Sequence, residues 1–529
     1  MRWRAVSEGV ARRSGLMIPL FSCPSSTSWG VGDIGDLVHL TRWLAGGAQR
    51  LLQLLPLNEM APDQQSPYSA ISAMAVDPIY VRVPDVPEFA ALGGEASLSR
   101  GSRELLDAVR RSPKIDYSAI RRLKQAALRS AFERFLNVEW CHDTARAREL
   151  KAFISEQAWW VEDYALFRAI HASLDERPWT EWPAALQRRE PAEIDRARRE
   201  LTSEVLFYQY VQCEAAAEWR ASRRQTNGVA LFGDLPFMVD GDSADVWARQ
   251  YQFRLDASVG APPDAFSAEG QNWGMPLYRW DVIEAEHFRW LRERVRRSAD
   301  LFDGYRIDHL VGFYRTYAWP LDASKPFFTP ADEPAQTRLG ERLMAVFREA
   351  GSTIIAEDLG TVPDFVRASL TRLNIPGFRV LRWERLWKVE GQPFRDPADY
   401  PAVSVATSGT HDTESLAVWW EGCSAEERDL IAALPTIRRI AAADLSAARY
   451  NPVVRDTLIE ALFASGSNLL LLPLIDVFGW SDRINEPATI GGDNWTYRLP
   501  WPSDRWDEIP TACERQGALN RWAAKYRRA

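Results

Sequence analysis

Thr353-Ile-Ile-Ala-Glu-Asp-Leu-Gly360 is a short apolar run that ends in carboxylates. Its length and its β-branched residues predict a buried β-strand with the glutamate at its end. Two other carboxylates also lie where apolar runs end. Asp308 lies near the end of Gly304-Tyr-Arg-Ile-Asp-His309, and Asp412 lies in Ser408-Gly-Thr-His-Asp-Thr413. In a (β/α)8 barrel, the C-terminal ends of all strands meet at one face. We therefore expect the three acids to point into one cleft.

Eight apolar segments have the length of strands. They are residues 15–21, 51–57, 229–237, 304–309, 353–358, 377–382, 402–407 and 468–475. Helical patterns separate several of them, for example Asp33–Leu44 and Asp364–Leu373. Because strands that alternate with helices imply a parallel sheet, we predict the α/β class and a (β/α)8 TIM barrel.

The gap between the second and third segments is too long for one crossover, and residues 103–225 are rich in Arg, Ala, Glu and Leu at helical spacing. We predict one barrel domain over residues 1–529, with a mainly helical subdomain inserted at 58–228 and a loop insertion over the cleft at 238–280. Residues 476–529 are too few for a C-terminal β-sandwich, which takes about 100 residues.

Composition limits the partners. The net charge of −8 argues against nucleic acid, which binds basic surfaces. The five cysteines are scattered without metal-ligand spacing, so we expect free thiols in a reducing compartment and no metal site. No stretch is long and apolar enough to span a membrane.

The N-terminal segment has some features of a lipoprotein signal. Arginines precede the apolar segment Gly15–Cys23, as they do in a lipoprotein signal. Pro19 interrupts that segment, and cleavage there would remove the first barrel strand. We therefore expect a cytoplasmic protein.

The residue types at the strand ends suggest chemistry on glycosidic bonds, which needs a nucleophile, a proton donor and often a further carboxylate. Arg306 and Asp308 are two residues apart on a strand, so both face the same side, and the guanidinium can keep the carboxylate ionised. The alternative is an Arg–Asp pair that only fills a barrel layer. Glu357 follows an apolar strand, where desolvation would raise its pKa towards that of a proton donor. Asp358 would point the other way.

Asp412 completes the set as a ligand for sugar hydroxyls, with His411 as a donor to them. Two of the six histidines, His309 and His411, adjoin candidate acids. The order Asp, Glu, Asp resembles the α-amylase superfamily.

Several motifs make the resemblance more specific. They are Pro24–Gly35, Ser66-Pro-Tyr68, Gly233–Pro236, Asp242–Ala248, Gly260–Ser267, Gly270–Asp281, Arg483–Pro487 and Asn494-Trp495. Over about residues 15–500 the chain resembles 4-α-glucanotransferases of the amylomaltase or disproportionating-enzyme type, glycoside hydrolase family 77.

This resemblance implies roles for the candidate residues. Asp308 would be the nucleophile, Glu357 the general acid/base and Asp412 the transition-state stabiliser, with Arg306 and His411 assisting. Other residues fall where the family contacts the glucan: Asp234, Asp264, Gln271, Trp273, Ser66 and Tyr68.

The segment 260–274 resembles a loop that arches over the cleft, and Pro262-Pro263 would stiffen it. Trp273 would stack on a sugar or, alternatively, anchor the loop. Two segments depart from the family pattern, Pro62–Gln65 and Thr413-Glu-Ser415, and they bear on chain-length preference.

The resemblance implies a retaining transferase that moves a segment of an α-1,4-glucan to the 4-hydroxyl of an acceptor glucan or glucose, without a cofactor. Maltooligosaccharides, starch and glycogen are the expected substrates. The alternatives are a retaining α-1,4-glucan hydrolase that uses the same acids and a non-catalytic glucan-binding protein. Products formed from maltotriose would separate the three.

Overall fold

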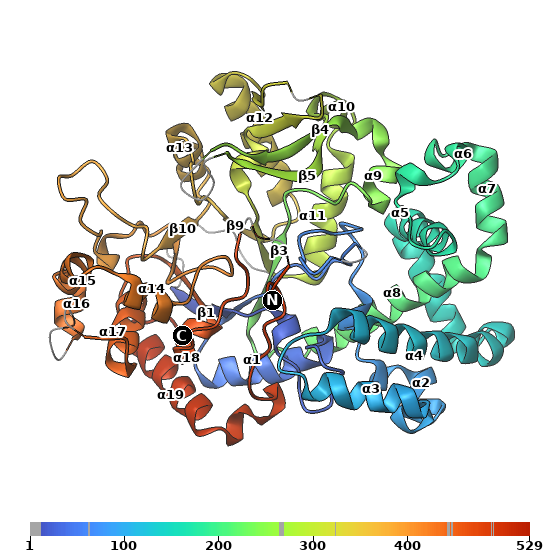
Figure 1. Cartoon of the computed structure of the whole chain (residues 1–529), viewed down its shortest axis with the longest axis horizontal. Helices are drawn as coiled ribbons and strands as arrows, with labels where there is room; N and C mark the ends of the chain where they lie inside the picture. Colours follow the sequence, from blue (N-terminus) through green and yellow to red (C-terminus); the bar gives the residue numbers. More distant parts are fainter. Residues whose placement is uncertain are drawn as a thin grey trace.

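The computed structural model describes residues 12–61, 64–263, 269–322, 324–441, 445, 448–487, 489 and 491–529. Eight parallel strands close into a barrel in the spatial order β1-β12-β11-β10-β9-β6-β3-β2 (Figure 1). Their bounds are β1 Arg13–Met17, β2 Leu51–Gln53, β3 Ala230–Leu235, β6 Gly304–Ile307, β9 Thr353–Ala356, β10 Gly377–Val380, β11 Ser404–Thr407 and β12 Leu469–Pro473. The predicted barrel is confirmed, and each predicted segment contains or overlaps one of these strands.

All eight barrel strands are shorter than the apolar runs that predicted them. The first run continues past β1 into a 3-10 turn at Leu20–Ser22, where the side chains stay buried. Burial keeps a segment apolar whether or not its backbone continues in the sheet. The runs therefore located the strands but overestimated their lengths.

The barrel interior is a packed core. One cluster of buried side chains fills it: Leu51, Phe232, Ile355, Phe378, Val380, Val405, Leu469 and Leu471. Towards the C-terminal ends of the strands, inward positions become polar. Asp234 on β3 and Arg306 on β6 are direct register partners. The polar end of the barrel thus begins in the layer above the apolar core.

Helices surround the barrel. They include α1 Leu37–Gly46, α11 Arg289–Leu301, α12 Glu333–Arg348, α13 Asp364–Arg372, α14 Leu416–Gly422, α15 Ala425–Ala432, α16 Pro435–Ile440, α17 Pro452–Phe463, α18 Leu474–Phe478 and α19 Pro510–Lys525. The helical pattern predicted over 33–44 begins as a 3-10 turn at Ile34–Asp36, where the Asp36 carboxylate accepts a hydrogen bond from Asp33 N at 2.9 Å.

Residues between β2 and β3 are mainly helical. Their helices are α2 Pro87–Ala91, α3 Arg100–Arg111, α4 Tyr117–Val138, α5 Ala145–Ser173, α6 Ala184–Gln187, α7 Pro191–Glu200 and α8 Thr202–Arg223, which form one side of the molecule in Figure 1. Trp179 and Trp182 are buried here as packing residues. The part of the chain that the structure describes contains no helix long and apolar enough to cross a membrane.

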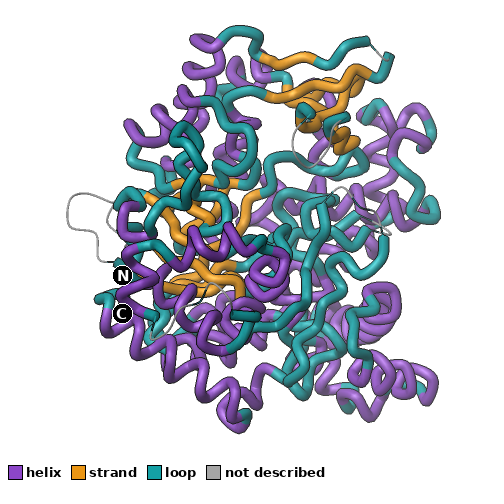
Figure 2. Tube along the Cα trace, turned by 60° about the vertical axis from the view of Figure 1, so that its left-hand side comes forward, coloured by secondary structure: helices purple, strands orange, loops and turns teal. Residues whose placement is uncertain are grey.

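A second sheet, which the sequence did not predict, lies beside the barrel. It is antiparallel, in the order β5-β4-β7-β8, with β4 Phe253–Ala261, β5 Gln271–Tyr278, β7 Thr316–Pro320 and β8 Phe327–Thr329. Figure 2 shows it as a group of strands set apart from the barrel strands. The short helices α9 Ala244–Ala248 and α10 Trp280–Ala285 flank β4 and β5 in sequence.

Candidate active site

Arg306 lies at the centre of the candidate site. Its Nη1 is 2.8 Å from both carboxylate oxygens of Asp234 and 2.9 Å from Asp308 Oδ1. Its Nη2 is 4.0 Å from Glu357 Oε2. The side chain of Arg306 is only 5% exposed, so these charges interact in a poorly solvated environment. One guanidinium therefore holds Asp308 and reaches towards Glu357, which brings two of the three predicted acids together.

Glu357 is positioned by the backbone. Its Oε1 accepts a hydrogen bond from Leu359 N at 2.9 Å, and its Oε2 accepts one from His309 N at 2.9 Å. Burial raises the pKa of Glu357 to about 7, although Arg306 opposes the shift. Such a carboxyl group can exist as an acid or a base near neutral pH, as a proton-transfer catalyst must.

Asp358, the next residue, points away from the cleft as predicted. Its Oδ1 accepts a hydrogen bond from Phe378 N at 2.7 Å, and Arg367 and Arg379 approach its Oδ2. Asp358 therefore joins β9 to β10 and α13, and it does not contact the other acids.

Asp412 lies on the loop between β11 and α14. Its Oδ2 is 3.3 Å from His411 Nε2, and its Oδ1 accepts a hydrogen bond from Asn485 Nδ2 at 2.6 Å. Burial opposes ionisation, but His411 and Asn485 lower the pKa of Asp412 to about 2. Asp412 is therefore an anion at any physiological pH, with a side chain that is 40% exposed.

Tyr68 connects the two halves of the site. Its hydroxyl donates to Asp234 Oδ2 at 2.7 Å and lies 3.1 Å from His411 Nε2. The rings of Tyr68 and His411 stack at 5.4 Å, and Trp495 packs against both. Burial raises the pKa of Tyr68 far above its ordinary value, so the hydroxyl remains a donor. Arg306, Asp234, Tyr68, His411 and Asp412 thus form a continuous polar network.

Gln271 and Trp273 lie on β5 at the edge of this network. Trp273 Nε1 donates to Gln271 Oε1 at 3.1 Å, and the indole meets His309 edge to face at 4.8 Å. Because His309 follows Asp308, the second sheet extends to the barrel mouth.

Not every predicted residue joins the site. Ser66 Oγ accepts a hydrogen bond from Tyr68 N at 3.3 Å, so it shapes the turn before the tyrosine. Asp264 lies outside the described residues, as do Pro62 and Asp63 of the departing segment.

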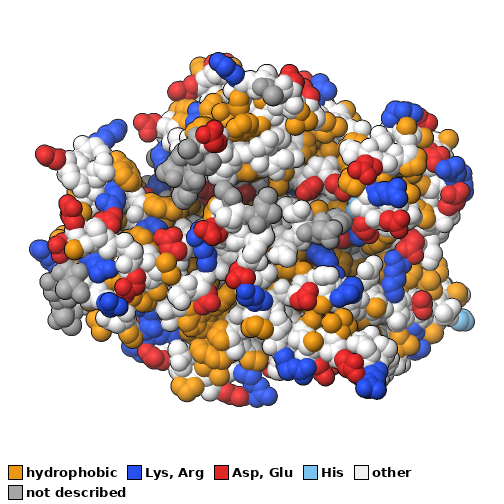
Figure 3. All heavy atoms as spheres, viewed as in Figure 1, with side chains coloured by type: hydrophobic (Ala, Val, Ile, Leu, Met, Phe, Trp, Pro, Cys, Tyr) orange, Lys and Arg blue, Asp and Glu red, His pale blue; other side chains and the backbone are white. Residues whose placement is uncertain are grey.

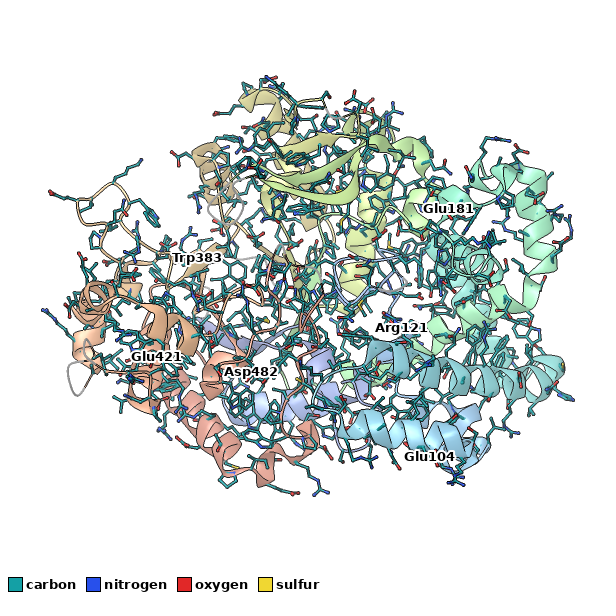
Figure 4. All side chains as sticks on the ribbon, viewed as in Figure 1. Glu104, Arg121, Glu181, Trp383, Glu421 and Asp482 are labelled. Carbon is teal, nitrogen blue, oxygen red and sulfur yellow. The ribbon has the colours of Figure 1, made fainter. Side chains whose placement is uncertain are left out.

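Two backbone contacts of the His411-Asp412 segment were not predicted. Arg483 Nη2 donates to the Asp412 carbonyl at 2.8 Å, and Asn485 N donates to the His411 carbonyl at 3.1 Å. Both residues lie in the Arg483–Pro487 motif, just after Asp482, which Figure 4 labels. The resemblance of this motif to the family was the only sign of its importance in the sequence. The segment is a loop, so it has neither helical nor strand periodicity.

At the C-terminal ends of its parallel strands, the barrel thus carries an ionised Asp412, an Asp308 paired with an arginine, and a Glu357 with a raised pKa. This arrangement is typical of enzymes that act on glycosidic bonds. The family model 4-alpha-glucanotransferase, glycoside hydrolase family 77, matches residues 18–503. The chain therefore belongs to the 4-alpha-glucanotransferase family.

Individual relatives agree with this assignment. The chain is 32% identical to the 4-alpha-glucanotransferase of Thermus thermophilus over 507 residues, which cover 92% of this chain and 95% of the relative. It is 30% identical to that of Chlamydia pneumoniae over 515 residues, which cover 94% and 93%. Among solved structures, an amylomaltase from Streptococcus agalactiae in complex with acarbose matches with a TM-score of 0.81 and 26% identity, covering 98% of this chain and 100% of the other.

Proposed function

We propose that this protein is a 4-α-glucanotransferase that works by retaining double displacement. The observation that carries the proposal is the Arg306 centre: one buried guanidinium binds Asp308 and approaches Glu357, whose pKa burial raises to about 7. A carboxylate paired with a guanidinium, beside a second carboxyl group that can be protonated near neutral pH, is the pair that such chemistry requires.

In the first step, Glu357 donates its proton to the glycosidic oxygen while an Asp308 oxygen attacks C1 of the donor sugar. The C1–O bond breaks, the shortened glucan leaves with a free 4-hydroxyl, and the donor segment stays esterified to Asp308. Two backbone N–H groups fix the Glu357 carboxyl, so proton donation needs no reorientation of that group.

In the second step, the Glu357 carboxylate removes the proton from the 4-hydroxyl of an acceptor glucan. The acceptor oxygen bonds to C1 and the ester to Asp308 breaks, which restores both carboxyl groups and retains the α configuration. Asp412, anionic throughout, stabilises positive charge on the sugar ring and binds its hydroxyls together with His411.

Glucan contacts are assigned to the surrounding polar groups. Tyr68 and Gln271 would bind sugar hydroxyls, Trp273 would stack on a sugar face, and Ser66 and Asp264 would also contact the glucan. The predicted contact of Asp234 with sugar is not supported, because its side chain is fully buried; it holds Arg306 and Tyr68 instead. Figure 3 shows acidic and basic side chains interspersed over the visible face, as suits a neutral ligand. The acarbose complex of the Streptococcus agalactiae relative supports an oligosaccharide-like occupant.

We further propose how the chain is divided, which substrates it uses and where it works. Residues 58–228 act as a mainly helical subdomain, and residues 238–280 as an insertion over the cleft. The substrates are maltooligosaccharides, starch or glycogen, and the protein works in the cytoplasm without a cofactor. The named relatives are transferases, which favours transfer over the hydrolase alternative.

Maltotriose is the substrate that tests the proposal. The transferase should produce glucose together with a ladder of longer maltooligosaccharides, since each donor segment is passed to another glucan. A hydrolase would give only shorter products, and a binding protein would give none. The Asp308→Asn variant, which lacks the nucleophile, should lose at least about three orders of magnitude in turnover and serves as the blank.

A further inference from the structure

The loop that carries His411 and Asp412 is held at both ends by one buried carboxylate. Asp476, on α18, accepts a hydrogen bond from Ser408 Oγ at 2.6 Å and another from Leu416 N at 2.7 Å. Ser408 begins the loop after β11, and Leu416 begins α14. Asp476 is 2% exposed, so water does not compete for its carboxylate. Its Oδ2 binds one end of the loop and its Oδ1 binds the other.

Arg382 ties the same loop from the other side. It follows β10, and its Nε donates to the Ser408 carbonyl at 3.1 Å. Its Nη1 donates to the carbonyl of Glu414 at 3.0 Å and to the Glu414 carboxylate at 2.9 Å. Arg382 is 5% exposed, and it contacts neither Asp412 nor the other two acids by any bond among the described residues.

Between these ends, the loop closes on itself. Thr413 Oγ1 donates to the Thr410 carbonyl at 3.0 Å and accepts from Thr410 N at 3.1 Å. A Cβ at Gly409 would lie 2.4 Å from Thr413 Oγ1, so the turn has no room for a side chain there. A tight turn with fixed ends leaves few positions for the Asp412 carboxylate.

We propose that Asp476, assisted by Arg382, is a positioning residue for Asp412 and so for the transition state of glucan transfer. This inference rests on the function proposed above. Asp476 acts through Ser408 and Leu416 and does not touch substrate. A carboxylate that must stabilise developing charge has to be fixed beforehand, and a displacement of about 1 Å can cost about a hundredfold in rate.

The decisive variant is Asp476→Ala, compared with Asp476→Asn. The alanine frees both loop ends, and we expect kcat on maltotriose to fall about 10- to 100-fold while KM changes less than about threefold. The asparagine keeps an oxygen for Leu416 N, and the Ser408 hydroxyl can rotate to accept from its amide. We expect Asp476→Asn to recover most of kcat.

Asp396→Ala is the matched control. Asp396 is likewise buried, and its oxygens accept hydrogen bonds from Ala398 N and Thr436 N, each at 2.8 Å, but it ties a loop away from the acids. It should lower thermal stability as Asp476→Ala does and leave kcat of the folded fraction unchanged. Equal kcat for the two alanine variants, or a loss at Asp476 that lies wholly in KM, would overturn the proposal.

Ser408→Ala covers the case in which Asp476→Ala does not fold. It removes one of the two ties, and kcat should fall about 3- to 10-fold. Unchanged kcat in a folded Ser408→Ala variant would also overturn the proposal. The products of the wild-type enzyme test the proposed function separately. If they show only hydrolysis, the proposed transfer is wrong, but the effect of the variants on kcat still tests the role of Asp476.

Discussion

Glu357 is the residue whose titration should control the pH dependence of the enzyme. Burial raises its pKa to about 7, and the first step needs its protonated form. We expect kcat/KM to be level below pH 7 and to fall about tenfold per pH unit above it. His309 does not contribute to this limb, because burial lowers its pKa to about 4, and Asp412 stays ionised above pH about 2.

Steady-state kinetics from pH 5 to 9 would measure this limb. A donor with a fluoride leaving group needs no protonation, so its cleavage should lack the basic limb and should survive in the Glu357→Gln variant. A limb that persists with the fluoride donor would show that another group titrates.

The same pKa makes a prediction about stability. Glu357 has a folded pKa of about 7 against 4.5 for an ordinary glutamate, so its ionisation disfavours the fold. The penalty is absent below pH about 4.5 and complete above pH about 7, where it reaches about 3 kcal/mol. Glutamine removes the charge but mismatches one backbone donor, at a cost of about 1 kcal/mol.

We therefore expect Glu357→Gln to be more stable than the wild type by about 1 to 2 kcal/mol at pH 8 and not at pH 4.5. Thermal denaturation at the two pH values checks this. A stability difference that does not depend on pH would contradict the assignment of the raised pKa to Glu357.

At the scale of elements, the β4–β5 hairpin brings Trp273 against His309, beside Asp308, the proposed nucleophile. An aromatic side chain here would hold an incoming glucan and restrict water at the ester to Asp308. Trp273→Ala should slow transfer more than donor cleavage and raise the ratio of hydrolysis to disproportionation. Glucose release and ladder formation from maltotriose give the two rates.

Trp280→Phe is a control, since Trp280 is a buried aromatic on the nearby helix α10. It should leave the ratio unchanged. Equal loss of transfer and cleavage in Trp273→Ala would reduce Trp273 to a donor-side or packing residue.

The elements differ in how well sequence predicts them. The barrel strands β9 and β12 are fully or almost fully buried, so they appear as continuous apolar runs. Strand β4 is exposed at Leu255 and Asp256 and carries register shifts, and β5 contains glycine and proline. Such strands show neither a continuous run nor a clean alternation, which is why the second sheet was not predicted.

The residues of the candidate site also differ in how well the sequence predicts them. The carboxylates at strand ends were predictable because their position follows from the barrel. The bonds of Asn485 and Arg483 to the Asp412 loop were not, because they join two loops 71 or more residues apart in sequence. Nothing in local periodicity fixes where two loops meet.

At the scale of the whole molecule, Arg528 stabilises the place where the first barrel strand, β1, pairs with the last, β12, which we call the barrel seam. It is fully buried, and its side chain donates to the carbonyls of Phe463 at 2.7 Å and Ser467 at 2.8 Å, just before β12. Its own carbonyl accepts from Ser14 N on β1 at 3.2 Å. The residue thus joins both strands of the seam.

Arg528→Met should destabilise the protein by about 2 kcal/mol, because the buried Ser467 carbonyl loses its side-chain donor and the Phe463 carbonyl keeps only that of Arg12. Activity at low temperature should be preserved, since the site lies at the other end of the strands. Arg527→Met is the control, because Arg527 is exposed. Thermal inactivation rates compare the three proteins, and equal rates would show that the seam does not depend on Arg528.

The pairing of β1 with β12 also has a consequence during synthesis. Arg13 lies opposite Leu469, so β1 leaves the ribosome long before its second neighbour exists. Until then one edge of β1 has unpaired backbone groups, which can join a strand of another chain. Tyr68 and His411 are likewise 343 residues apart. A nascent chain therefore cannot close its barrel until the last strand has been translated, and until then the open edge of β1 must be protected from pairing with other chains.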